Sequence, residues 1–195
     1  MFLKFVSYYK PHLRLFIFDM SCALITAMCS MFYPMIVRRM INTYVPERAL
    51  YMIVGWSAAL FVIYVIKAAM VYSVQYYGHT MGVRIQLDMR RDAFSHLQRL
   101  PFSYFDRTQT GGIMSRIIND TFEIAELAHH GPEDLFLSVV LLSGSFILLC
   151  TMNFTMTLII FALIPILFWF AYKQRQNLSK ASMASRTRIG EVNAD

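Results

Sequence analysis

The fold is decided by residues 51–100, which read YMIVGWSAALFVIYVIKAAMVYSVQYY (51–77) and then GHTMGVRIQLDMRRDAFSHLQRL (78–100). The first part is mostly apolar, with Lys67 as its only charged residue, and it exceeds the roughly 20 residues that cross a hydrocarbon core. The second part has no proline and is amphipathic. We therefore predict one continuous helix. At about 1.5 Å per residue it would be about 75 Å long, and less than half of that length fits in a bilayer.

The projecting part of this helix should have one apolar side and one polar side. At helical spacing, the residues expected on the apolar arc are Val83, Leu87, Met89, Ala93, Phe94, Leu97 and Leu100. Those expected on the polar arc are Arg84, Asp88, Arg91, Asp92, His96, Gln98 and Arg99. Ile85 and Arg90 do not fit this division.

Three further apolar runs lie at residues 15–37, 135–152 and 155–172. The chain of 195 residues is 57% hydrophobic and only 15% charged, whereas soluble domains carry about 25% charged residues. We predict an all-α integral membrane fold with four transmembrane helices and long cytoplasmic helical extensions. Residues 1–12 are expected to form a short interfacial helix that turns at Pro11 into the first span.

The expected boundaries follow from these runs and from the breaks between them. The first span is predicted at about 13–44, the second helix at about 50–100, the third at about 112–151 and the fourth at about 155–195. Pro101, Ser103 and the Gly111-Gly112 pair interrupt the chain between the second and third helices. A short helix is therefore expected across this tip, at about 103–110.

The basic residues predict the orientation. Lys and Arg gather in the N-terminal segment (three), in the segment between the second and third runs (six) and after the fourth run (five). The other two connections contain three and none. By the positive-inside rule the N-terminus, the middle segment with the tip, and the tail are cytoplasmic. We expect a multi-pass protein of the cell membrane. The net charge of +6 is spread along the edges of the apolar runs, so nucleic acid is not an expected partner.

The tip and the return helix read LPFSYFDRTQTGGIMSRIINDT at residues 100–121. This stretch resembles the first intracellular loop of the type-1 transmembrane domain of ABC exporters of the multidrug and lipid kind. The elements that match in order are Pro101, Ser103, Tyr104-Phe105-Asp106, Thr110-Gly111, Ser115-Arg116 and Asn119-Asp120. Residues 152–168 (MNFTMTLIIFALIPILF) and 186–195 (RTRIGEVNAD) resemble later parts of the same domain.

The resemblance implies six membrane helices per half-transporter, two halves, and an ATP-binding domain that presses on the tip. Residues 103–107 would then form the first coupling helix. The residues expected to dock the ATP-binding domain are Ser103, Tyr104, Phe105, Asp106, Arg107, Thr108 and Gly111, within a docking segment at 101–112.

The sequence also departs from the family pattern. It has four apolar runs, and G-x-x-x-x-G-K-[ST], the phosphate-binding loop of many ATPases, does not occur in it. We therefore expect a partial transmembrane domain without catalytic residues or a cofactor of its own. ATP and Mg²⁺ would bind to the missing ATP-binding domain, and membrane lipid and a second half-transporter would be the other partners.

Some polar residues lie in or beside the apolar runs. Lys67 is a possible pathway residue, since charges at membrane depth usually face a cavity or a partner. Asp19 is expected to pair with Arg14 or to be wetted. Glu126-x-x-His129 matches half of a di-iron motif, but no second copy exists, so no metal site is expected. Gly78-x-x-x-Gly82 permits close helix packing.

Two alternatives to the exporter stay open on the sequence alone. The chain could be a four-helix membrane scaffold or sensor whose cytoplasmic hairpin binds a signalling partner. It could also be a regulator without an ATPase that pairs with an intact half-transporter. Two more apolar spans and a phosphate-binding loop beyond Asp195 would favour the exporter.

Overall fold

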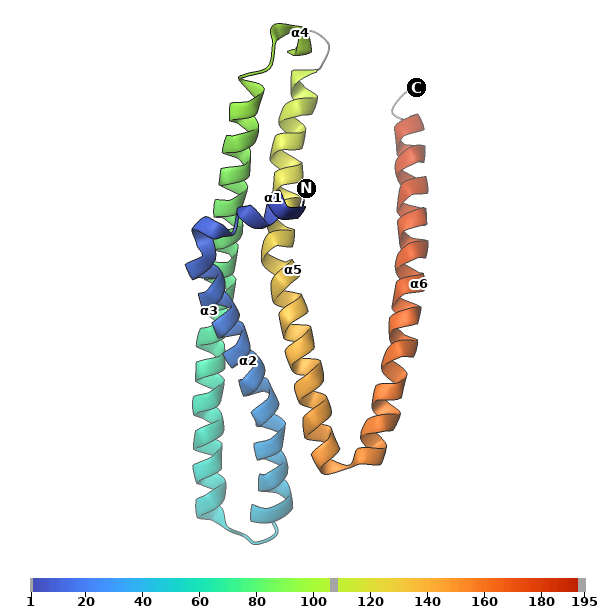
Figure 1. Ribbon diagram of the computed structural model, residues 1–195. Coiled ribbons are helices and arrows are strands. Elements are labelled where there is room, and N and C mark those ends of the chain that lie inside the picture. Colours follow the sequence, from blue (N-terminus) through green and yellow to red (C-terminus); the bar gives the residue numbers. More distant parts are fainter. Residues whose placement is uncertain (1, 106–108, 193–195) are drawn as a thin grey trace. The chain divides into compact units, whose positions relative to one another are not determined.

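A computed structural model describes residues 2–105 and 109–192. The described residues form helices joined by short connections, and none of them is in a strand (Figure 1). Four helical segments are long and apolar enough to cross a membrane: Lys4–Tyr44, Leu50–Leu97, Thr110–Met152 and Phe154–Leu178. The predicted all-α membrane fold with four spans is therefore confirmed.

The N-terminal elements are α1 (Phe2–Ser7), the 3₁₀ turn η1 (Lys10–His12) and α2 (Leu13–Arg39). α2 runs on into the π-helical turn η2 (Met40–Tyr44). A tight turn with Arg48 in the left-handed region (φ 51°) then leads into α3 (Leu50–Leu97). Pro34 lies within α2 without ending it.

The remaining elements are α4 (Phe102–Phe105), α5 (Thr110–Met152) and α6 (Phe154–Val192). α5 continues through Gly131-Pro132 without a break. Asn153 separates α5 from α6 and caps the second helix, because its Oδ1 accepts a hydrogen bond from the backbone N–H of Met156 (3.1 Å). This local contact satisfies one of the free N–H groups at a helix start.

The chain divides into two compact units, residues 1–142 and 143–195. In the first unit, α2 packs on α3 through small side chains. Cys22 and Ala23 of α2 meet Val74 of α3 in a buried cluster, and Met70 and Leu137 cover it. Small residues let two helices approach closely, which is how helices commonly associate in lipid. In the second unit, the rings of Phe146 of α5 and Phe161 of α6 pack edge to face, with centroids 4.8 Å apart.

The side of α3 that packs on its neighbours differs from the predicted apolar arc. Val83, Leu87 and Phe94 of the predicted apolar arc are 63%, 56% and 52% exposed, so the neighbouring helices leave them largely uncovered. Ile85, which did not fit the arc, is fully buried beside Met81 and Ala128. The side of α3 that packs against α5 contains Gly78 and Gly82, because only residues without a bulky side chain allow α5 to come this close.

Candidate functional site

The tip of the α3–α5 hairpin presents aromatic side chains outward. α4 is a single turn in which the backbone N–H of Tyr104 donates to the Pro101 carbonyl at 3.0 Å. The side chain of Phe102 is 89% exposed, and that of Tyr104 is 38% exposed. Phe105 is half-buried and contacts the Tyr104 ring edge to face, with centroids 5.5 Å apart. An exposed aromatic cluster of this kind is typical of a protein-binding surface.

The boundaries around the tip differ by a few residues from those expected. α3 ends at Leu97 rather than at Leu100, and α4 begins at Phe102 rather than at Ser103. α5 begins at Thr110, so Gly111 lies in its first turn and the Gly-Gly pair does not break the helix. Of the predicted docking residues, Asp106, Arg107 and Thr108 lie outside the described part of the chain.

A groove of about 510 Å³ lies beneath the tip, between the ends of the two long helices. It is lined by Ala93, His96, Leu97, Tyr104, Gln109, Gly112, Ile113, Arg116 and Ile117. Tyr104 thus belongs both to the exposed turn α4 and to the wall of the groove.

Two contacts tie α3 to α5 below the groove. Arg90 donates from Nε to Thr121 Oγ1 (3.1 Å) and from Nη2 to the Ile118 carbonyl (3.1 Å). Arg90 is therefore a link between helices, which explains why a charged residue stands within the predicted apolar arc of α3. The guanidinium holds a fixed fork of donors, so this link also fixes the register of the two helices.

The N-terminal segment holds the same hairpin from the side. Tyr8 Oη donates to Asp92 Oδ2 of α3 (2.8 Å), and Tyr9 Oη donates to the Ala128 carbonyl of α5 (2.7 Å). His12 Nε2 lies 3.0 Å from Asp88 Oδ2. The turn between α1 and η1 therefore contacts α3 and α5 through its two tyrosines, and these contacts connect the hairpin to the beginning of α2.

The close approach of α3 and α5 depends on Gly78 and Gly82. A Cβ placed on Gly78 would overlap the ring of His129, and one placed on Gly82 would lie 3.4 Å from the Ala125 carbonyl oxygen. The Gly78-x-x-x-Gly82 pattern thus forms the helix contact that its spacing suggested. The imidazole of His129 occupies the space that a side chain at Gly78 would need.

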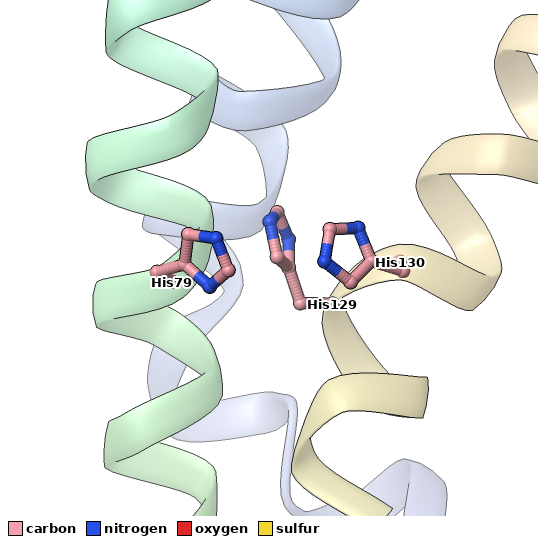
Figure 2. Close-up of side chains that lie close together, drawn as sticks. All are labelled: His79, His129 and His130. Atoms are coloured by element: carbon pink, nitrogen blue, oxygen red, sulfur yellow. The ribbon is translucent and has the colours of Figure 1, made fainter.

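Around this contact the structure gathers polar residues that sequence reasoning did not combine. His79 of α3 faces His129 and His130 of α5 (Figure 2). Asp19 of α2 is fully buried, with Oδ2 3.8 Å from His129 Nδ1, so the expectation that it is wetted or paired with Arg14 was wrong. The i, i+3 and i, i+4 spacing of the histidines and acids on α5 was visible in the sequence. That Asp19 of α2 and His79 of α3 join these residues becomes visible only in the folded structure.

Lys67 lies in α3 within its apolar run and is partly buried. Among the described residues it takes part in none of the ion pairs. Its assignment as a pathway residue stays a prediction.

Comparison with known proteins identifies the family. The sequence profile of the ABC transporter transmembrane region matches residues 16–194. The chain is 38% identical over 191 residues to the uncharacterized ABC transporter ATP-binding protein YwjA of Bacillus subtilis (strain 168), covering 98% of this chain and 33% of the relative. It is 26% identical over 166 residues to a multidrug resistance ABC transporter ATP-binding and permease protein of Lactococcus lactis, covering 85% of this chain and 27% of the relative.

A third relative is the ATP-dependent lipid A-core flippase of Thiobacillus denitrificans, which is 23% identical over 189 residues. That match covers 97% of this chain and 33% of the relative. The chain therefore spans about a third of the length of the curated relatives it matches. The four apolar helices, the α3–α5 hairpin and the profile match lead to one conclusion: this chain belongs to the family of ABC transporter transmembrane regions.

Proposed function

We propose that this chain forms part of the substrate pathway of an ATP-driven exporter and transmits the motion of an ATP-binding domain through the tip at residues 101–112. The observation that carries the proposal is the length and continuity of α3 and α5. α3 has 48 residues and α5 has 43, which correspond to about 72 Å and about 65 Å, against about 30 Å of hydrocarbon. Each helix must therefore extend well beyond the membrane.

The contacts within the hairpin support a role as a lever. Arg90 links α3 to α5, the glycines let the two backbones approach, and Tyr8 and Tyr9 brace both helices from the side. A pair of helices tied at several heights bends less than a single helix. A displacement of α4 would therefore move the membrane-embedded parts of α3 and α5 rather than being absorbed on the way.

The docking partner is proposed to be an ATP-binding domain that itself binds ATP and Mg²⁺. The names of the relatives, which include ATP-binding proteins, support this choice. The excess of Lys and Arg at the N-terminus and tip supports a cytoplasmic position for both, in a chain that crosses the cell membrane several times.

A second half-transporter and lipid would cover the apolar side chains that α3 and α5 leave exposed. On the projecting parts these include Val83, Leu87, Phe94, Ile118 and Phe122, each about half exposed or more. Apolar surface of this extent outside a bilayer favours a protein partner.

Photocross-linking tests the docking partner directly. In the intact transporter, p-benzoylphenylalanine in place of Ser103 is expected to cross-link to the ATP-binding domain, because Ser103 lies on the exposed turn α4. The linked peptides would be identified by mass spectrometry. The same probe in place of Tyr51, which is 81% exposed at the opposite end of α3, is the control and should give no such product. Cross-links from position 103 only to unrelated proteins would instead support the scaffold or sensor.

A further inference from the structure

We infer that the junction of α2, α3 and α5 is a binding site for a divalent transition metal ion of the zinc class, with His79, His129, His130 and Glu133 as ligands and Asp19 as a partner of His129. This inference goes beyond the exporter function and does not depend on it. Imidazole nitrogen is a preferred ligand of zinc, and a site with three histidines and one carboxylate suits a tetrahedral ion.

The three imidazoles converge from two helices. The ring centroids of His79 and His129 are 5.0 Å apart, those of His79 and His130 are 5.5 Å apart, and those of His129 and His130 are 4.5 Å apart. One nitrogen from each ring lies within 4.8 Å of the other two. Ligand atoms around a tetrahedral zinc ion lie about 3.3 Å apart, for bonds of about 2.0 Å. Since His79 is exposed and His130 is 41% exposed, both rings have room to turn inward by that amount.

His129 supplies the second, independent observation. Its ring is 1% exposed, and neither ring nitrogen has a hydrogen-bond partner among the described residues. An imidazole buried in this way loses its hydrogen bonds to water without replacing them, which costs free energy. A metal ion bound to one nitrogen, with a carboxylate accepting from the other, would satisfy both.

The surrounding acids decide which nitrogen has which role. Asp19 Oδ2 lies 3.8 Å from Nδ1 of His129, and Glu133 Oε2 lies 3.7 Å from its Nε2. Nδ1–H would therefore donate to Asp19 after a small shift, which leaves Nε2 for the metal. A histidine ligand whose other nitrogen donates to a carboxylate is the usual arrangement at zinc sites.

The Glu133 carboxylate lies close to two of the three rings. Its Oε2 is 3.7 Å from His129 Nε2 and also 3.9 Å from His130 Nδ1, so one carboxylate oxygen faces both rings. Glu126 Oε2, 3.6 Å from His130 Nε2, would orient that ring from the solvent side. The carboxylates also offset the charge of a divalent cation in a partly buried place.

The site lies where the three helices leave their apolar runs. Asp19 is near the start of the first run, His79 follows the end of the second, and Glu133 precedes the third. A bound ion would therefore join α3 to α5 at the base of the projecting hairpin, with α2 held through Asp19. The Glu-x-x-His spacing on α5 does not predict this site, because no second copy of the motif exists and the further donors come singly from α2 and α3.

Direct titration of the intact protein tests the site. The chelator-treated protein in detergent, free of nucleotide, would be titrated with ZnCl₂ by calorimetry and with CoCl₂ by the visible ligand-field absorption of Co²⁺. We expect one ion per chain at this site, with the strong absorption of four-coordinate Co²⁺. His79→Ala and His130→Ala should each weaken binding by about a hundredfold or more, because loss of an outer-shell partner alone commonly costs about 10–100-fold.

The variants are chosen so that folding does not decide the result. His79 and His130 are not in the buried core, and His96→Ala, at an exposed position on α3, is the matched control that should bind as the unchanged protein does. Asp19→Asn should weaken binding by about tenfold. The inference is overturned if the unchanged protein binds neither ion, or if His79→Ala and His130→Ala bind as tightly as His96→Ala.

Discussion

Gly78→Ala is expected to destabilise the protein by about 1–3 kcal/mol, the usual cost of forcing extra volume into a packed contact. The new Cβ would overlap the ring of His129, which is buried at the helix contact, so the ring or the helices would have to move. Either movement would loosen the base of the hairpin. The measurement is the thermal midpoint of the detergent-solubilised protein, taken with a chelator present so that bound metal does not contribute.

Two variants isolate the cause of this effect. Gly55→Ala, on the same helix with no atom within 4 Å of the added Cβ, should be neutral or stabilising, since alanine is the better helix former. In a His129→Ala background the ring is absent, so adding Gly78→Ala should cost little more. An equal loss of stability from Gly78→Ala in both backgrounds would contradict the proposed clash.

Replacement of both Tyr104 and Phe105 by alanine is expected to uncouple ATP hydrolysis from transport in the intact protein. The two rings pack on each other at the tip, and Tyr104 also lines the groove between α3 and α5. Aromatic anchors commonly supply much of the binding energy of an interface. We expect reconstituted transport to fall by about tenfold or more, while ATP hydrolysis stays within about twofold of its original rate.

The matched control removes similar apolar surface far from the tip. Leu50 and Tyr51 are 74% and 81% exposed at the other end of α3, and Leu50→Ala with Tyr51→Ala should leave coupling intact. Membrane insertion of both double variants would be compared by fractionation. Undiminished transport by the tip variant would count against the coupling role of α4.

The membrane fold was predictable because its signals are local. Apolar runs near 20 residues gave the spans, and the ordered motif from Pro101 to Asp120 gave the family, which the match over residues 16–194 confirms. The helix ends were predicted less accurately. Gly131-Pro132 and Gly111-Gly112 both lie within α5, because residues that weaken a helix do not end it when its neighbours hold it in place.

The packing of the hairpin was harder to predict because helical spacing does not say which side a partner will occupy. The contact with α5 follows Gly78, Gly82 and Ile85, and Arg90 points inward to reach backbone on α5. A hydrophobic arc drawn on α3 alone excludes such residues. The cluster of polar residues at the junction of α2, α3 and α5 was not predicted for a related reason. Asp19, His79 and His129 are far apart in the sequence and meet only once the three helices are packed. The roles of Ser103, Gly111 and Lys67 stay predictions.

The most direct test of the account is the position of the tip relative to the membrane. In a protein with Cys22, Cys29 and Cys150 replaced by serine, Phe102→Cys would be treated with a membrane-impermeant maleimide in intact cells and in inside-out vesicles. Phe102 is 89% exposed, so the thiol should react readily wherever the reagent has access. The account predicts labelling in inside-out vesicles and none in intact cells. Labelling from the outside of intact cells would contradict a helical lever that projects into the cytoplasm.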